Sequence, residues 1–120
     1  MAWLGNLFVG LAVTVGLSIP NTIYYVAPPP LTIEEKILAE LPPVFIEIAK
    51  AESQMNPQAY NPEKHLGCAG SYGLLQVACI HFEGEPTFDV DTNIQLAKKV
   101  YEEQGFDAWG VCREKVKCYE

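Results

Sequence analysis

Residues 49–62 of the chain read AKAESQMNPQAYNP, and residues 70–77 read GSYGLLQV. The first segment ends a helix that we expect over about residues 44–55, because a helix usually stops before a proline such as Pro57. On that helix Glu52 shares one face with apolar side chains at helical spacing. The apolar members of this face are Phe45, Ile48 and Ala49. The sequence therefore places one carboxylate on the buried face of a helix, close to its end.

A carboxylate in such a position is costly unless it is paired or protonated. Burial raises its pKa, which is what a general acid needs to work near neutral pH. Taken alone, however, Glu52 is explained better as a half-exposed or ion-paired glutamate at the rim of the helix face. The residues around it have to decide between these two interpretations.

Together the two segments resemble the lytic transglycosylase family of the lysozyme superfamily. In that family a Glu-Ser pair at a helix end is followed by Asn-Pro, a small residue and a polar loop, and then by a glycine-rich segment that lines the glycan cleft. The matching residues are Glu52-Ser53, Asn56-Pro57, Ala59, Asn61 and Gly70 to Gln76. The later stretch FDVDTNIQLAKKVYEEQGFDAW resembles the family's Asn-Ile helix, so the resemblance covers about residues 46–109.

The resemblance implies a role for the matching residues. Glu52 would protonate the glycosidic oxygen and then act as a base once the leaving sugar has departed. Ser71 would orient the substrate or the acid, and Gln76 would line the cleft and hold the glycan. Further candidates for contact with substrate are Ser53, Asn61, Tyr60, Tyr72 and Trp109. For the aromatic residues among them, packing in the core or at the rim is an equally good explanation.

Three more residues are candidates for a structural role around these segments. Gly70 and Gly73 would let the backbone approach the sugar closely, although an ordinary turn explains each glycine equally well. Asn93 is a candidate support for the glycine-rich loop, but an asparagine at a helix start is the simpler account.

The sequence departs from the family in one respect. It has no Ala-Tyr-Asn-Ala-Gly segment, whose tyrosine touches the catalytic acid in many relatives. It also offers no compelling second carboxylate. The candidates by position alone are Asp89, Asp91, Glu63, Glu83 and Glu85, of which Asp91 is explained as a helix cap and the others as residues of exposed loops. A single acid agrees with the resemblance, since the substrate's N-acetyl group would stabilise the oxocarbenium centre and its 6-hydroxyl would close a 1,6-anhydro ring.

The resulting hypothesis is cleavage of the β-1,4 bond between N-acetylmuramic acid and N-acetylglucosamine by lytic transglycosylation. The partner would be a peptidoglycan strand, and no cofactor is expected. Two alternatives stay open. One is hydrolysis of the same bond by a muramidase, including a lysin of a phage or virion. The other is a glycan-binding membrane protein that has kept the fold without turnover.

Charge divides the chain into two parts. Residues 1–30 contain no Lys, Arg, Asp or Glu, so the net charge of −7 falls on residues 31–120. This acidic balance argues against nucleic acid as a partner, because phosphate binding needs clustered basic residues. Residues 31–120 are enough for one compact core, which covalent cross-links such as disulfides would help to stabilise.

The N-terminal segment predicts a membrane anchor. Residues 2–26 are uncharged and largely apolar, and about 20 such residues suffice to cross a bilayer as a helix. A cleaved signal peptide is the alternative, but the segment has no basic start and no good cleavage site. Residues 27–30, APPP, form a stiff spacer. We therefore expect a single-pass membrane protein with residues 31–120 outside the cytosol.

The four cysteines are Cys68, Cys79, Cys112 and Cys118. An even number in a small domain behind an apolar segment predicts two disulfides. Three pairings are open, and we favour Cys79–Cys112 with Cys68–Cys118, which would tie the tail to the central loop. A zinc site is disfavoured, because the sequence has no Cys-x-x-Cys pair and no histidine at ligand spacing.

The remaining elements are predicted from local signals. Thr32 and Glu35 form a capping-box pattern that opens a helix over about 33–41. Residues 55–73 are expected as loop, and the apolar run 74–82 as a buried helix or strand. Asp91 is expected to cap a helix that stops at Gly105, and residues 106–120 to form a short helix closed by a disulfide. The predicted fold is mainly α, in the α+β lysozyme-like manner, with a short loop or hairpin region.

Overall fold

The computed structural model describes residues 23–120, and its contacts divide the chain into two units, residues 1–30 and 31–120. The predicted anchor at residues 1–26 lies almost wholly outside the described residues. From Ile23 to Pro30 the chain has no helix or strand, and its side chains are exposed. Across the described part of the chain, no helix combines the length and the apolar character needed to span a bilayer.

The first two helices follow from the sequence. Helix α1, Ile33–Glu40, begins with the predicted capping box, in which the Thr32 side chain accepts from the Glu35 backbone N–H and the Glu35 side chain accepts in return. Helix α2, Val44–Ser53, ends two residues before the predicted Met55. Gln54 and Met55 both have left-handed φ values, 57° and 62°, which turn the chain away from the helix axis.

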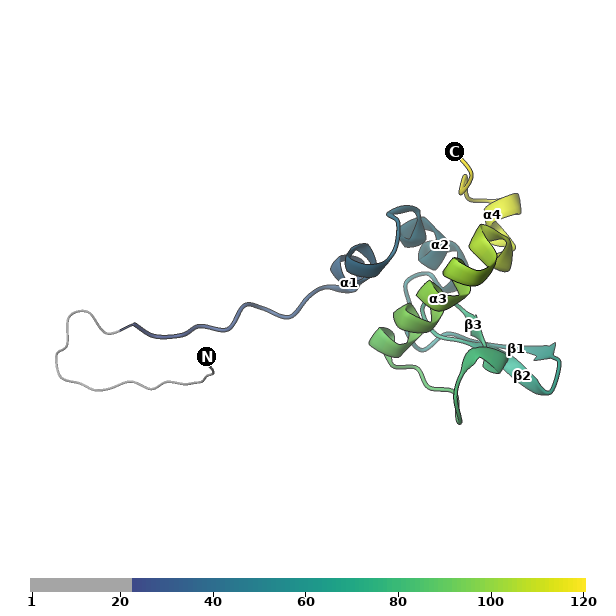
Figure 1. The fold of residues 1–120 in the computed structure, drawn as a ribbon, viewed down its shortest axis with the longest axis horizontal. Helices are drawn as coiled ribbons and strands as arrows, with labels where there is room; N and C mark the ends of the chain where they lie inside the picture. Colours follow the sequence, from purple (N-terminus) through teal and green to yellow (C-terminus); the bar gives the residue numbers. More distant parts are fainter. Residues whose placement is uncertain (1–22) are drawn as a thin grey trace. The chain divides into compact units, whose positions relative to one another are not determined.

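A three-stranded antiparallel sheet follows, in the order β1-β2-β3 (Figure 1). Its strands are β1, Tyr60–His65, β2, Cys68–Tyr72, and β3, Val77–Ala78. The prediction of a loop over residues 55–73 was therefore wrong for most of that range. The polar sequence of β1, YNPEKH, lacks the apolar alternation of a half-buried strand, and its backbone hydrogen bonds come from pairing with β2.

Strands β1 and β2 are interrupted by a bulge. Asn61 pairs with Ser71 and Lys64 pairs with Ala69, so the two residues between on β1 oppose one residue, Gly70, on β2. Gly70 has a φ of +105°, which favours glycine. The bulge therefore lies directly beside the glycine-rich segment.

The run from 74 to 82 is neither one helix nor one strand. It forms a turn, then β3, and then a short 3-10 helix, η1, at Cys79–His81. Helix α3, Val90–Gln104, stops at Gly105 as predicted, but its N-cap is Asp89 rather than Asp91. The Asp89 side chain accepts from the Thr92 backbone N–H at 2.9 Å, whereas Asp91 lies in the first turn and pairs with Lys36 at 3.1 Å.

The C-terminal tail contains a 3-10 helix and a short α-helix. These are η2, Gly105–Ala108, and α4, Val111–Glu114. Helix α3 packs against α1 and η2, while α2 contacts α1 and α4. Residues 31–120 thus form a small domain with four α-helices and a three-stranded sheet, which confirms the mainly helical prediction.

Two disulfides are present, but the favoured pairing was wrong. The bonds are Cys68–Cys79 and Cys112–Cys118. Strand β3 pairs with β2, which returns Cys79 to the hairpin that holds Cys68. The chain reverses after α4, which brings Cys118 back to Cys112. Both bonds therefore close local loops, and neither ties the tail to the sheet.

The tail is held by the core instead. Trp109 is 4% exposed, and its ring meets that of Phe45 edge-on at a centroid distance of 5.0 Å. Phe45 also contacts Tyr101 and Phe106 from α3 and η2. This aromatic group joins α2, α3 and the tail around one buried ring.

The surroundings of Gly73 leave no space for a larger side chain, which gives a testable prediction. It has a φ of +79°, and a Cβ there would lie 2.6 Å from Nδ2 of the fully buried Asn93. We expect Gly73→Ala to lower the free energy of unfolding by about 1–3 kcal/mol for the backbone alone, and by more because Asn93 is displaced.

The matched control is Gly84→Ala, because Gly84 has a φ of +86° with open space around its Cβ position. Urea unfolding of both variants separates the backbone cost from the contact with Asn93. Equal losses in the two variants would contradict the packing constraint.

Candidate active site

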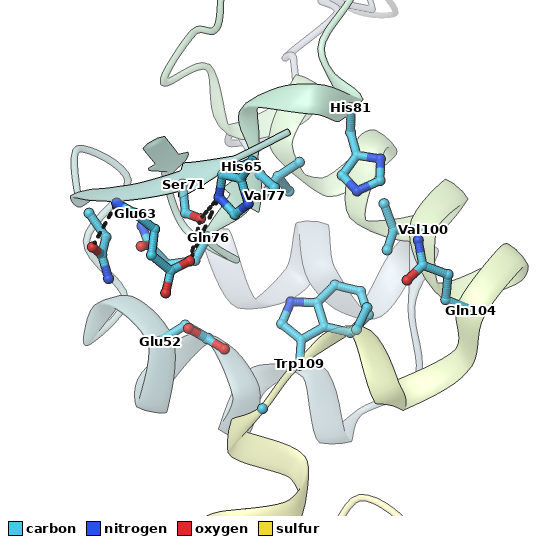
Figure 2. Close-up of a pocket in the computed structure, with 14 residues that line it drawn as sticks. Glu52, Glu63, His65, Ser71, Gln76, Val77, His81, Val100, Gln104 and Trp109 are labelled. Atoms are coloured by element: carbon cyan, nitrogen blue, oxygen red, sulfur yellow. Dashed lines mark hydrogen bonds and ion pairs between the residues drawn. The ribbon is translucent and has the colours of Figure 1, made fainter. Parts of the chain in front are cut away.

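A cleft of about 310 Å³ lies between α2, the sheet and the tail. Glu52 lines it from α2, while Asn61, Glu63 and His65 line it from β1. All three line the cleft, although the bulge at Pro62 and Glu63 interrupts the regular alternation of the strand between Asn61 and Lys64. Figure 2 shows Glu52 on one side of the cleft and the side chains of the sheet on the other.

Glu52 is half-buried at the end of α2. Burial, assisted by the nearby charge of Glu63, raises the pKa of its carboxyl from 4.5 to about 7. Lys115 acts against this rise and Glu114 adds to it. A substantial fraction of Glu52 therefore carries a proton near neutral pH, as a general acid requires.

Ser71 connects the sheet side of the cleft. It pairs with Asn61 on β1 and with Ala78 on β3, so the three residues form a row across the sheet and all three line the cleft. The Ser71 side chain is almost fully buried. Its Oγ lies 3.2 Å from Nε2 of His65 and 3.4 Å from Oε1 of Glu63.

Gln76 lines the cleft with a left-handed backbone, φ 50°. Its Nε2 donates to the carbonyl oxygens of Ala59 at 3.2 Å and Gly73 at 3.1 Å. Both bonds use the amide nitrogen, so the amide oxygen is the group that Gln76 has left for a ligand.

Two residues outside the glycine-rich segment, Ser53 on α2 and Asn93 on α3, bind its backbone from the protein interior. Ser53 is buried, and its Oγ lies 2.7 Å from the Leu74 carbonyl oxygen and 3.0 Å from that of Ala49. Asn93 is fully buried, accepts from the Leu75 N–H at 2.8 Å, and donates to the carbonyl oxygen of Tyr72. Asn93 thus supports the loop from within and is more than a helix-start residue.

The aromatic candidates are separated by the structure. Trp109 lines the cleft, and its indole N–H donates to the Leu75 carbonyl at 3.0 Å. Tyr60 and Tyr72 do not line the cleft. Their rings pack together at a centroid distance of 5.0 Å, and Tyr72 also contacts Phe82 and Phe88.

This aromatic packing also explains Gly70. A Cβ at Gly70 would lie 2.7 Å from atoms of the Tyr60 and Tyr72 rings. Gly70 and Gly73 therefore make room for side chains of the protein itself.

Four polar cleft residues were missed or misplaced by the sequence analysis. Glu63 was assigned to an exposed loop, and His65, His81 and Gln104 were not singled out. Glu63 and His65 belong to a strand whose sequence, YNPEKH, has no apolar alternation, so it carries no strand signal for them. His81 and Gln104 come from η1 and α3, and no local pattern marks them.

Comparisons of the chain with protein-family models, curated proteins and solved structures find no match. Among residues 23–120, no group of three or more His, Cys, Asp or Glu side chains is arranged to hold a metal ion.

The raised pKa of Glu52 predicts a pH-dependent stability. Between pH 4.5 and about 7 the folded protein keeps a proton that the unfolded chain has released, so stability falls as pH rises through this window. We expect Glu52→Gln, which removes this titration, to raise the thermal midpoint relative to the native protein at pH 8 and to change it least at pH 4.

The control is Glu47→Gln, because Glu47 is exposed on the same helix. Thermal unfolding followed by circular dichroism at both pH values measures the effect. A Glu52→Gln difference that is the same at pH 4 and pH 8 would refute the assignment of this titration to Glu52.

Proposed function

We propose that this protein cleaves the β-1,4 bond between N-acetylmuramic acid and N-acetylglucosamine in peptidoglycan, with Glu52 as the general acid. The observation that supports this most strongly is the half-buried Glu52 carboxyl in a polar cleft, with its pKa raised to about 7. Protonation of the glycosidic oxygen makes the departing sugar a better leaving group.

The lysozyme-like assignment of the fold belongs to this proposal. It is supported by an acid at a helix end beside a small antiparallel sheet, and by the resemblance of the segments around Glu52 and Gln76 to lytic transglycosylases. In that reaction the substrate's N-acetyl group stabilises the positive charge at the anomeric carbon. The 6-hydroxyl of the muramic acid then closes a 1,6-anhydro ring, with Glu52 accepting its proton.

Hydrolysis of the same bond is the second candidate function, and the position of Glu63 in the cleft favours it. Its carboxylate lines the cleft close enough to raise the pKa of Glu52. Two carboxyl groups beside one glycosidic bond are the usual requirement for hydrolysis. Both candidates share Glu52 as the acid and differ in what attacks the anomeric carbon.

We also propose that the domain acts outside the cytosol beside a membrane, as an enzyme of the bacterial envelope or as a phage or virion lysin. The two disulfides support a non-reducing compartment. The uncharged segment 2–26 supports a membrane anchor, and the spacer at 27–30 is short enough to keep the domain near the bilayer.

Glu52→Gln tests the proposal directly. The full-length protein with both disulfides formed is incubated in mild detergent with purified peptidoglycan, and soluble fragments are identified by mass spectrometry. We expect the native protein to release muropeptides and Glu52→Gln to release them about 10²–10⁴-fold more slowly, because proton transfer to the leaving oxygen is lost.

Glu47→Gln, on the same helix but outside the cleft, should release fragments at the native rate. If the native protein bound peptidoglycan but released no fragment, the result would contradict the enzyme proposal and favour a glycan-binding protein. Equal release by the native protein and Glu52→Gln would show that the acid lies elsewhere.

A further inference from the structure

The bulge in β1 directs a second carboxylate to the cleft. Pro62 and Glu63 together oppose Gly70, and such bulges commonly redirect a side chain beside an active site. Glu63 lines the cleft, and its side chain is 59% exposed. It is therefore open to water while it faces the same space as Glu52 (Figure 2).

A chain of polar contacts lies behind Glu63. An ionised carboxylate only accepts, so the single hydroxyl hydrogen of Ser71 is donated to Oε1 of Glu63 across 3.4 Å. Oγ of Ser71 is then free to accept at 3.2 Å from the His65 tautomer that carries its hydrogen on Nε2. The same His65 nitrogen lies 3.7 Å from Oε1 of Glu63. Both contacts engage Oε1, which leaves Oε2 for another partner.

The supports are better buried than the carboxylate that they hold. Ser71 is 5% exposed, and the His65 side chain is 21% exposed. A surface ion pair between two flexible side chains would need no buried serine between them, and such pairs contribute little to stability. The arrangement of one shielded donor, Ser71, with His65 behind it and an accessible carboxylate in front is that of an oriented base.

We infer that Glu63 is a second catalytic carboxylate, which activates a water molecule and makes the protein a hydrolase of its glycan. The inference rests on the proposed function, because it assigns the attacking group in the same cleavage. Ser71 and His65 are positioning residues that act through Glu63.

The step balances without any further reactant. Glu52 gives its proton to the glycosidic oxygen as the bond from that oxygen to the anomeric carbon breaks. A water oxygen bonds to the anomeric carbon, and the proton of that water passes to Glu63. The products are a free 4-hydroxyl on one sugar and a reducing end on the other. Exchange with solvent then restores the proton on Glu52 and removes the one on Glu63.

The test measures the new chain ends. Full-length native protein is incubated with peptidoglycan in water enriched in oxygen-18, and the muropeptides are identified by mass spectrometry. We expect reducing ends that carry one oxygen-18 atom. We expect Glu63→Gln to form these reducing ends about 10²-fold more slowly than the native protein. Anhydro ends should then make up the larger share of the products that this variant still releases.

Two further variants separate catalysis from folding. Glu83→Gln removes an exposed carboxylate outside the cleft and should match the native protein. Ser71→Ala should lower kcat with little change in KM, and Ser71→Thr, which keeps the hydroxyl, should recover part of that loss. A purely structural Ser71 would show no such recovery at equal thermal stability.

The outcomes distinguish this inference from the function on which it rests. Release of anhydro ends alone by the native protein, still dependent on Glu52, would overturn the role of Glu63 and keep the transglycosylase. An unchanged rate and product ratio in Glu63→Gln would also overturn it. Absence of any release from native protein would remove both proposals together.

Discussion

The backbone of the Leu74–Leu75 turn is the point on which the rest of the domain depends. Both residues are fully buried, so their polar backbone groups cannot reach water. Ser53 contacts the Leu74 carbonyl oxygen, Asn93 accepts from the Leu75 N–H, and Trp109 donates to the Leu75 carbonyl. Each buried group left without a partner would cost about 1–3 kcal/mol. The three side chains therefore fix the end of α2, the start of α3 and the tail around one turn.

This arrangement also positions the candidate active site. Glu52 precedes Ser53 on α2, and Gln76 follows Leu75 in the chain, so the bonds that satisfy the turn hold these cleft residues in a fixed relation. Trp109 brings the tail to the cleft through the same turn. The Cys68–Cys79 bond joins β2 to η1 on one side of the cleft, the Cys112–Cys118 bond closes a loop in the tail, and neither connects α2 to the sheet. The buried polar side chains, more than the disulfides, thus define the shape of the site.

The cleft holds two carboxyl groups in different environments. Glu52 lies on a largely apolar helix face, where burial favours its neutral form. Glu63 lies on an exposed strand edge, where the Ser71 hydroxyl donates to it and His65 lies behind Ser71, and its negative charge further raises the pKa of Glu52. Different environments for two titratable groups are a general means of assigning acid and base roles. The proposed cleavage and the proposed role of Glu63 follow from this asymmetry.

The sequence by itself determined the features that depend on neighbours along the chain. Helical periodicity and the capping box placed α1, most of α2 and α3, and put Glu52 on the apolar face of its helix. The even number of cysteines indicated two disulfides. Only the tertiary structure decided the β1–β2 hairpin, the partners of the cysteines and the placement of Glu63 in the cleft. The physical reason is that the polar sequence of β1 carries no local strand signal. The other features depend on contacts that form only when separate parts of the chain meet, namely the strand pairing, the disulfides and the constraints on Gly70 and Gly73.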